Sequence, residues 1–398
     1  MNNYFETSAR LVQATSTQIV RYLYHGIDWN QRLTGILGAR GTGKTTLMLQ
    51  RLKLQYEGSR DALYLSLDRL VLLNYQLYEL ADQFYKMGGK ILFLDEVHKY
   101  PNWAIEIKSI YDDYPNLQIV FSGSSALLLQ QAGADLSRRA SMYHLNNLSF
   151  REFVLFKTGN EIPPLTLPEI LENHPAHAVR INQTIQILPL FTEYLKSGAY
   201  PYYFESPALF HDRLMATVKT IIESDLMALS SFSYSSIVAM QKILALIAES
   251  VPFKPNISEL SRKSGVVRDI LLKMIDLLVR ADLLIMLRQD SSPTGYLTKP
   301  EKLYLHNPAL AWAISINREP ETGAMRETFF LNQLSCQHLV TLPKSGDFLV
   351  NNRFTFEIGG MGKTNRQIKD IPDSFVVQDN IETGFGQTVP LWLFGFLY

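Results

Sequence analysis

GARGTGKT, residues 38 to 45, is the stretch that decides the fold of this chain. It fits the phosphate-loop pattern of Gly, any four residues, and then Gly-Lys-Ser or Gly-Lys-Thr. The preceding LTGIL is apolar and typical of a strand, and the following TLMLQRL is typical of a helix, whose N-terminus favours an anion. This order of strand, glycine-rich loop and helix predicts a nucleotide-binding site on a parallel α/β sheet.

The residue types of this loop have a chemical reason. Glycines let backbone N–H groups converge on phosphate oxygens, Lys44 reaches the β and γ phosphates, and the Thr45 hydroxyl ligates Mg²⁺. We therefore expect ATP and Mg²⁺ as cofactors, although GTP-binding loops share the pattern. The residues expected to hold the nucleotide are Gly38, Ala39, Arg40, Gly41, Thr42, Gly43, Lys44, Thr45 and Thr46.

Two adjacent acids, Asp95 and Glu96, end the apolar strand in KILFLDEVH, residues 90 to 98. In phosphate-loop enzymes the first acid holds Mg²⁺ together with the loop threonine, and an adjacent Glu can orient or activate the attacking water. Asp95 is thus the second expected metal ligand, and Glu96 is an expected catalytic residue beside Lys44. The pair predicts hydrolysis of the nucleotide in addition to its binding.

Another apolar strand, LQIVFSG, ends in a serine-rich turn. If it lies beside the other strands, Ser124 would sense the γ-phosphate, although serine-rich turns follow strands in any fold. In LSRRA, Arg139 or alternatively Arg138 could bring positive charge to the transition state, in cis or across a subunit boundary. Solvated arginines fit the pattern equally well, and an arginine acting across a boundary would imply a homo-oligomer.

The composition indicates a globular chain without a strong charge bias. Its 398 residues are too many for one ordinary core, so two or three domains are expected. Lysine plus arginine and aspartate plus glutamate both number 38, which gives no whole-chain argument for binding nucleic acid or a membrane surface. The single cysteine, the polar opening MNNYFETSAR and the lack of a membrane-length apolar run predict a cytoplasmic protein.

Changes in periodicity divide the chain into three expected domains. Residues 1–183 alternate strands and helices and form the phosphate-loop domain, in which an amphipathic helix over residues 10–27 comes before the first strand. Residues 184–298 are helical, and residues 299–398 return to strands and turns, which predicts a separate α/β unit. The segment 158–180 is rich in Pro and His, and we expect an inserted loop or lid there.

The helical region contains a candidate nucleic-acid-binding element. ISELSRKSG, followed by VVRDILLKMIDLLVRADLLIML, has the order of a winged helix: short helix, glycine turn, longer helix and strand. Such modules bind DNA or serve only for packing. The basic residues that could meet phosphates are Lys254, Arg262, Lys263, Arg268 and Lys273, against acidic Glu259 and Asp269.

Two other clusters are weak functional signals. His174 and His177 lack the further ligands that a metal site needs, so we expect them to be exposed to solvent. The aromatic run AYPYYF, residues 199–204, predicts packing between domains rather than stacking on bases.

Five motifs together resemble a known family. In chain order they are GARGTGKTT, FLDEVHKYPNW, FSGSSALLL, LSRRASMYHLNNLSFREF and YLKSGAYPYYFE. They resemble the AAA-related P-loop ATPases of bacteria and archaea, over essentially the whole chain. The resemblance implies an AAA ATPase domain, a winged helix and a C-terminal domain similar to PD-(D/E)xK nucleases. In many relatives, Gly stands before the arginine that precedes LSF. This chain has the pair Arg138 and Arg139 instead, so either could be the arginine finger.

FEIGGMGKT, residues 356 to 364, repeats the Gly-Lys-Thr but does not fit a second phosphate loop. Glu357 stands where the pattern needs Gly, and no apolar helix follows. Acids on neighbouring strands with a lysine instead match a Mg²⁺-dependent phosphodiesterase. The nuclease pattern has lysine two residues after the acid, where Gly359 stands, so Lys363 would have to replace it. The candidates are Glu327, Asp347, Glu357, Lys363 and Gln367.

The expected function is an ATP-dependent molecular switch that acts on DNA. Hydrolysis would change the arrangement of the winged helix and the nuclease-like tail. One alternative is a signalling or scaffold ATPase whose inactive C-terminal domain binds a protein, which the missing lysine and the neutral charge favour. The other alternative is a nuclease gated by ATP.

Overall fold

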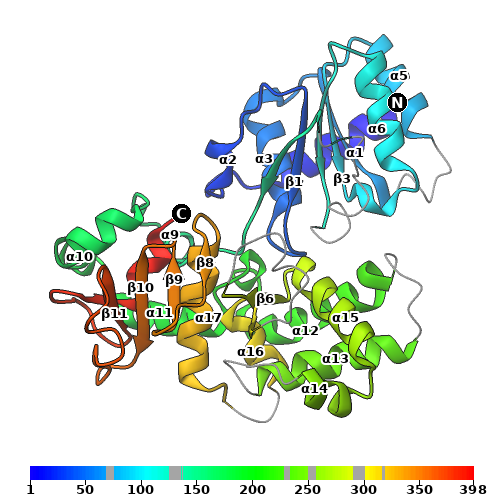
Figure 1. Cartoon of the computed structure of the whole chain (residues 1–398). Helices are drawn as coiled ribbons and strands as arrows, with labels where there is room; N and C mark the ends of the chain where they lie inside the picture. Colours follow the sequence, from blue (N-terminus) through cyan, green and yellow to red (C-terminus); the bar gives the residue numbers. More distant parts are fainter. Residues whose placement is uncertain are drawn as a thin grey trace. The chain divides into compact units, whose positions relative to one another are not determined.

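The computed structural model describes residues 1–68, 76–124, 136, 138–227, 234–249, 257–289, 301–315 and 319–398. The chain divides into two compact units, Met1–Asn146 and Asn147–Tyr398, each with its own core. Figure 1 shows the first unit in blue to teal and the second in green to red.

The first unit is built on a parallel β-sheet. Its strands follow the order β2-β3-β4-β1-β5, and every pair of neighbours is parallel. This confirms the α/β sheet that the phosphate-loop pattern predicts. The strands are β1 Leu33–Leu37, β2 Ala62–Ser66, β3 Ile91–Asp95, β4 Gln118–Ser122 and β5 Ser141–His144.

Helices cover both faces of this sheet because the central strands are apolar on both sides. Leu63 and Leu65 pack with α5 and α6 on one face, whereas Tyr64 packs with α1, α2 and α3 on the other. Figure 1 shows α3 and α6 on opposite sides of β1 and β3. The helices are α1 Asn2–Ala14, α2 Leu23–Gly26, α3 Lys44–Tyr56, α5 Leu77–Lys86, the short 3-10 turn Val97–Lys99 and α6 Trp103–Asp113.

Two elements of the first unit differ from the sequence prediction. The single helix expected over residues 10–27 is wrong: α1 ends at Ala14 because Thr15 is extended, and the separate α2 ends at Gly26. Strand β5 forms from a polar stretch in which no strand was expected. It pairs with β1 from Thr34↔Ser141 to Leu37↔His144, beside the start of the phosphate loop.

The second unit begins with helices and ends with a mixed sheet. Its helices are α9 Phe150–Thr158, α10 Leu167–Asn182, α11 Ile187–Ser197, α12 Phe210–Thr220, α13 Tyr234–Ala248, α14 Ile257–Ser264, α15 Arg268–Arg280, α16 Pro308–Ile314 and α17 Thr322–Ser335. Shorter 3-10 and π segments are Pro201–Tyr203, Pro207–Leu209, Ile221–Leu226 and Leu391–Phe396. Strands β6 Leu284–Leu287 and β7 Lys302–Leu305 form an antiparallel pair after α15. This order is compatible with a winged helix, which stays a prediction.

The loop or lid expected over residues 158–180 is wrong, because α10 occupies most of that segment. The Thr166 hydroxyl accepts from the Glu169 N–H, and the Glu169 carboxylate accepts from the Thr166 N–H, so a capping box starts the helix. The helix also contains Pro175 and is kinked at Asn173. The Thr-x-x-Glu of TLPE was the signal for this helix, and the proline and histidine content obscured it.

A five-stranded mixed sheet forms the end of the second unit. Its order is β12-β11-β10-β9-β8, with β10, β11 and β12 parallel and the other neighbours antiparallel. Phe330 of α17 packs on Phe348, Phe356 and Phe394 to make the core. The strands are β8 Val340–Thr341, β9 Phe348–Val350, β10 Phe354–Gly359, β11 Ser374–Gln378 and β12 Thr388–Pro390.

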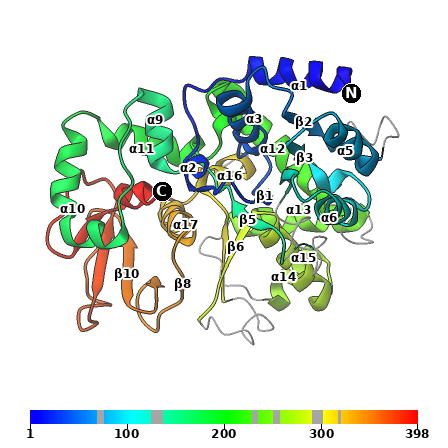
Figure 2. The same cartoon turned by 90° about the horizontal axis from the view of Figure 1, so that it is seen from above.

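Residues after Asn146 belong with the second unit, whereas the sequence placed residues up to 183 with the first. The Leu165 N–H donates to the Phe396 carbonyl at 2.8 Å, and the Ser149 hydroxyl donates to the Tyr398 carbonyl at 2.8 Å. Figures 1 and 2 show α9 and α10 beside the carboxyl-terminal segments. The aromatic run 199–204 also packs inside this unit. The finer division into three domains stays a prediction.

Candidate nucleotide-binding site

The phosphate loop connects β1 to α3 at the carboxyl edge of the parallel sheet. Gly38, Gly41 and Gly43 have φ angles of 151°, 87° and 97°, which side chains disfavour. A side chain at Gly38 would also collide with the carbonyl oxygen of Leu145, just after β5. The backbone therefore needs the two glycines of the pattern, Gly38 and Gly43, and favours a third at Gly41.

Lys44 is buried at the first turn of α3. Its Nζ donates to the carbonyl oxygens of Gly38 at 2.8 Å and of Ala39 at 2.9 Å. These bonds hold the ammonium group over the loop, where phosphate oxygens would be stronger acceptors than neutral carbonyls.

Asp95 brings together hydroxyl groups from three other elements. Its Oδ2 accepts from Thr45 Oγ1 at 2.6 Å and from Tyr64 Oη at 2.7 Å, and its Oδ1 accepts from the hydroxyl of Ser122. The side chain is only 2% exposed. Burial and the charge of Asp95 raise the pKa of Tyr64, which keeps this phenol a neutral donor. Thr45 and Asp95 therefore meet as two ligands of one Mg²⁺ ion would.

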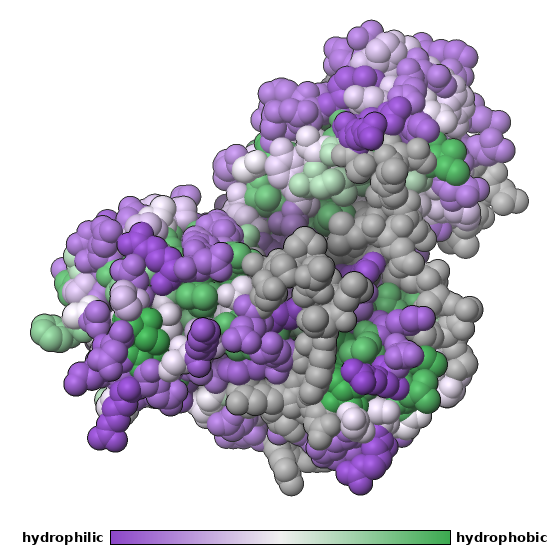
Figure 3. Space-filling model, in the orientation of Figure 1, coloured by the Kyte–Doolittle hydropathy of each residue, from purple (hydrophilic) through white to green (hydrophobic). Residues whose placement is uncertain are grey.

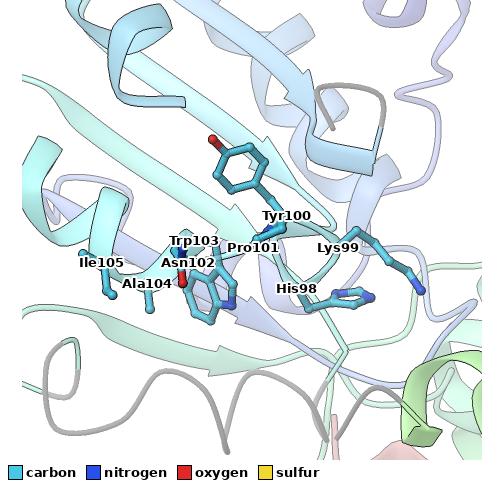
Figure 4. Close-up of a pocket in the computed structure, with 8 residues that line it drawn as sticks. All are labelled: His98, Lys99, Tyr100, Pro101, Asn102, Trp103, Ala104 and Ile105. Carbon is cyan, nitrogen blue, oxygen red and sulfur yellow. The ribbon is translucent and has the colours of Figure 1, made fainter. Parts of the chain in front are cut away.

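Glu96 follows β3 directly and stands next to His98. Its Oε2 lies 3.2 Å from His98 Nε2, and the Glu96 side chain is 27% exposed whereas that of His98 is 1% exposed. Glu96 is thus partly open to water, as a residue that activates water must be. Residues 98–105 line a pocket of about 400 Å³ in the segment after β3. Figure 4 shows its lining residues, with Tyr100 directed away from His98 and Trp103.

Arg21 is a further buried cation beside the loop. One Nη donates to the Thr42 carbonyl, and the other donates to the Asn146 carbonyl at 2.8 Å. Arg21 therefore ties the phosphate loop to the end of the first unit. No local pattern separates it from other arginines, because its partners are backbone carbonyls from distant segments.

The structure places Ser124, the expected sensor, and Arg139, the expected finger, beside residues other than those of the phosphate loop and Asp95. Ser122, rather than Ser124, contacts Asp95, while the Ser124 N–H points to His98 Nδ1 at 3.5 Å. The neighbouring Ser125 lies outside the described residues. Arg139 forms a double hydrogen bond with Asp112 of α6, at 3.1 Å for each nitrogen, whereas Arg138 is exposed. The finger assignment stays open.

Four of the five C-terminal candidates lie near one another in the second unit. Lys363 Nζ contacts Glu357 Oε1 at 2.6 Å, and Asp347 Oδ2 accepts from the Ile358 N–H at 2.8 Å. Glu327 accepts from Tyr304 Oη at 2.7 Å. Burial and the charge of Asp347 raise the pKa of Glu327. Gln367 is exposed, on the segment between β10 and β11.

Lys363 fills the space that a side chain at residue 359 would occupy. A Cβ placed on Gly359 would lie 2.6 Å from the Cβ and Cγ atoms of Lys363. Burial acts to lower the pKa of Lys363, but its hydrogen bond to Glu357 and the nearby acids outweigh this, so the pKa is raised. The charged Lys363 side chain therefore passes over Gly359 and contacts the Glu357 carboxylate.

The acids of this cluster do not form a ready-made metal cage. In the described residues, no group of three or more His, Cys, Asp or Glu side chains is arranged to hold a metal ion. However, Glu357 is 1% exposed and its Oε2 has no hydrogen-bond partner among them. That orphaned carboxylate oxygen fits a cation or a proton donor, since a buried acceptor is costly to leave unpaired.

The expectation that His174 is exposed to solvent is wrong. The ring is buried, and its Nε2 lies 3.1 Å from the Gly386 carbonyl. Burial lowers its pKa, so the ring favours the neutral form. His177 is partly exposed and next to Arg180. The pair therefore contributes to α10 packing rather than to a metal site.

The basic residues of the winged-helix prediction are only partly paired with acids. Lys263 of α14 contacts Glu259 at 2.9 Å, whereas Arg262, Arg268 and Lys273 are exposed. Figure 3 shows hydrophilic and apolar surface mixed over the region of α13 to α15. Lys254 lies outside the described residues.

No helix in the described ranges is long and apolar enough to span a bilayer.

Residues 30–154 match the family model described as an AAA domain. This segment contains the phosphate loop, β1 to β5 and the start of α9. This segment is therefore similar to AAA domains. No curated protein matches the chain.

Several solved structures are weakly similar to the chain. Orc1 from Aeropyrum pernix in complex with DNA is 15% identical, with 78% of this chain and 92% of that chain covered and a TM-score of 0.34. AMPPCP-bound DnaA from Aquifex aeolicus is 17% identical, covers 65% and 84%, and has a TM-score of 0.28. PCH-2 from C. elegans is 19% identical, covers 39% and 45%, and has a TM-score of 0.25.

Proposed function

We propose that this chain binds Mg-ATP at the phosphate loop and hydrolyses it. The observation that carries the proposal is the 2.6 Å contact of Thr45 with Asp95 beside the buried Lys44. A match to an AAA domain over the same segment supports it. Mg²⁺, when bound, would neutralise charge on the β and γ phosphates. Thr45 and Asp95 would hold the ion, because their oxygens already converge on one point.

The remaining residues have separate roles in this proposal. Lys44 would exchange its two loop carbonyls for phosphate oxygens, which stabilises the bound nucleotide. Glu96 would accept a proton from the attacking water, since its carboxylate is partly open to solvent. Ser122 and Tyr64 would fix the orientation of Asp95 through their hydroxyl groups.

Replacement of the proposed base tests hydrolysis. Glu96→Gln should bind ATP with the affinity of the wild type but turn it over about a hundredfold more slowly, because the amide cannot take a proton. Glu57→Gln, at an exposed position after α3, is the matched control. Wild-type turnover in Glu96→Gln would contradict the assignment.

We further propose that hydrolysis switches the arrangement of the two units and that α15 contacts DNA. Arg268 and Lys273 support the DNA proposal because they are exposed on one helix of a candidate winged helix. Lys273→Ala should weaken duplex DNA binding and lower the slope of log affinity against log salt by about one. Lys219→Ala, at an exposed position on α12 outside this element, is the control. DNA binding that salt does not weaken would favour the scaffold alternative.

A second candidate function is phosphodiester cleavage by the C-terminal unit. The observation that favours it is Lys363, which crosses Gly359 to reach Glu357 where the nuclease pattern would place its own lysine. Asp347 and the free oxygen of Glu357 would hold a divalent ion, which would activate water and stabilise charge on the phosphate. Lys363 would stabilise the negative charge that develops there.

Strand cutting tests this second candidate. Mg²⁺-dependent cleavage of DNA by the wild type should disappear in Glu357→Ala and in Lys363→Ala. Lys369→Ala, exposed on the same segment, is the control. A wild type that cuts no DNA with or without ATP would leave the tail as a binding module.

A further inference from the structure

The backbone at Glu96 is unusual for a side chain with a carboxylate. Its φ is 54° and its ψ is 41°, in the left-handed region that non-glycine residues rarely enter. Its N–H lies 3.1 Å from Asp95 Oδ1 and 3.5 Å from Ser122 Oγ, so the metal-site acid and the end of β4 hold this turn. The turn fixes the direction in which the Glu96 side chain leaves the sheet edge.

The carboxylate of Glu96 faces a buried imidazole. His98 lies in the 3-10 turn that follows Glu96, and its Nε2 is 3.2 Å from Glu96 Oε2. Because the ring is almost fully removed from solvent, it cannot move aside without opening the packing after β3. Figure 4 shows this ring on the segment that continues to Trp103.

The other nitrogen of His98 faces the turn after β4. The backbone N–H of Ser124 points to His98 Nδ1 across 3.5 Å. An N–H can only donate, so Nδ1 is the acceptor, and a neutral ring must carry its proton on Nε2. Nε2 lies 3.2 Å from Glu96 Oε2, in a contact that lacks the geometry of a hydrogen bond. One ring therefore joins the serine turn to the proposed base.

We propose that His98 is a positioning residue for Glu96 and that it couples Glu96 to the Ser122–Ser124 turn. The inference rests on the proposed ATP hydrolysis and names a control element of that same site. The Ser124 hydroxyl supports it, because it is buried without a hydrogen-bond partner among the described residues and can accept a new contact. A shift of Ser124 towards a bound phosphate would move the Nδ1 contact and, through the rigid ring, the 3.2 Å contact of Nε2 with Glu96.

The test compares substitutions at His98 by turnover and by nucleotide affinity. His98→Ala should lower kcat by about ten- to a hundredfold, because Glu96 loses its orientation, while the affinity for ATP stays that of the wild type. His98→Gln should recover part of kcat, since an amide can accept from Ser124 and donate to Glu96. His25→Ala, at an exposed histidine of the same unit, is the control.

A double substitution separates this role from a general loss of structure. His98→Ala added to Glu96→Gln should slow turnover no further than Glu96→Gln alone, since both changes remove one function. Unchanged kcat in His98→Ala, or equal loss in His98→Ala and His98→Gln with a lowered melting temperature, would overturn the coupling. A wild type that hydrolyses no ATP would overturn the proposed function as well, so the two failures are distinguishable.

Discussion

At the scale of single residues, the Asp95 carboxylate is held by hydroxyl groups of residues that are distant from it in the sequence. Thr45 comes from the phosphate loop, Ser122 from β4 and Tyr64 from β2, and together they orient both carboxylate oxygens. Tyr64 is one of the residues that no sequence pattern singles out. It lies two residues before Ser66, which pairs with Asp95 in the β2–β3 register, so only strand pairing brings the two side chains together.

Removal of the Tyr64 hydroxyl should weaken the proposed Mg²⁺ site. Tyr64→Phe deletes one hydrogen bond to a buried carboxylate, so the free energy of unfolding should fall by about 1–3 kcal/mol. The Mg²⁺ concentration for half-maximal ATP turnover should rise several-fold, whereas saturating Mg²⁺ should restore most of kcat. Tyr85→Phe, on the opposite face of the sheet, is the control. An unchanged Mg²⁺ requirement would contradict a role of Tyr64 at the site.

Glu327 should make the stability of the second unit depend on pH. Burial raises its pKa, so the folded state binds a proton more readily than the unfolded state does. Deprotonation of Glu327 therefore destabilises the fold as the pH rises above 4.5, the ordinary pKa of a glutamate side chain. Glu327→Gln should melt at a higher temperature than the wild type at pH 7, and the difference should shrink as pH falls to 4. A difference that grows at low pH would show the opposite sign.

At the scale of elements, α9 and α10 each begin with a capping box. The Ser149 hydroxyl of the first box also donates to the Tyr398 carbonyl and is buried, whereas Thr166 of the second is exposed. Ser149→Ala should therefore lower the free energy of unfolding by about 2 kcal/mol and Thr166→Ala by about 1 kcal/mol. Urea unfolding measures both. Equal losses would mean that the contact with Tyr398 contributes nothing.

The parts of the site that sequence predicts are those carried by neighbouring residues. The loop glycines, Lys44, Thr45 and the acids after β3 follow from local patterns, and the structure places Thr45 and Asp95 together. Ser122, Tyr64 and His98 acquire their roles only when β2, β3 and β4 align, which no local pattern encodes. Helix α10 was missed for another reason, since its capping signal was outweighed by Pro and His.

At the scale of the whole molecule, an ATP-driven switch should change the distance between the two units. Cys336 is the single cysteine and gives a partly exposed labelling position in the second unit. A cysteine introduced by Glu57→Cys gives another in the first unit. Energy transfer between dyes at these positions should change on addition of Mg-ATP, and Lys44→Ala should abolish the change. Equal transfer with and without nucleotide would contradict the switch.

Nucleotide affinity in Lys44→Ala tests the central claim most directly. The lysine should contribute charge-assisted bonds to phosphate, so its loss should weaken ATP binding by about ten- to a hundredfold. Lys86→Ala, at an exposed position on α5, should bind as the wild type does. Calorimetric titration of the three proteins with Mg-ATP decides the matter. If Lys44→Ala binds ATP as tightly as the wild type, residues 38–45 are not the nucleotide site.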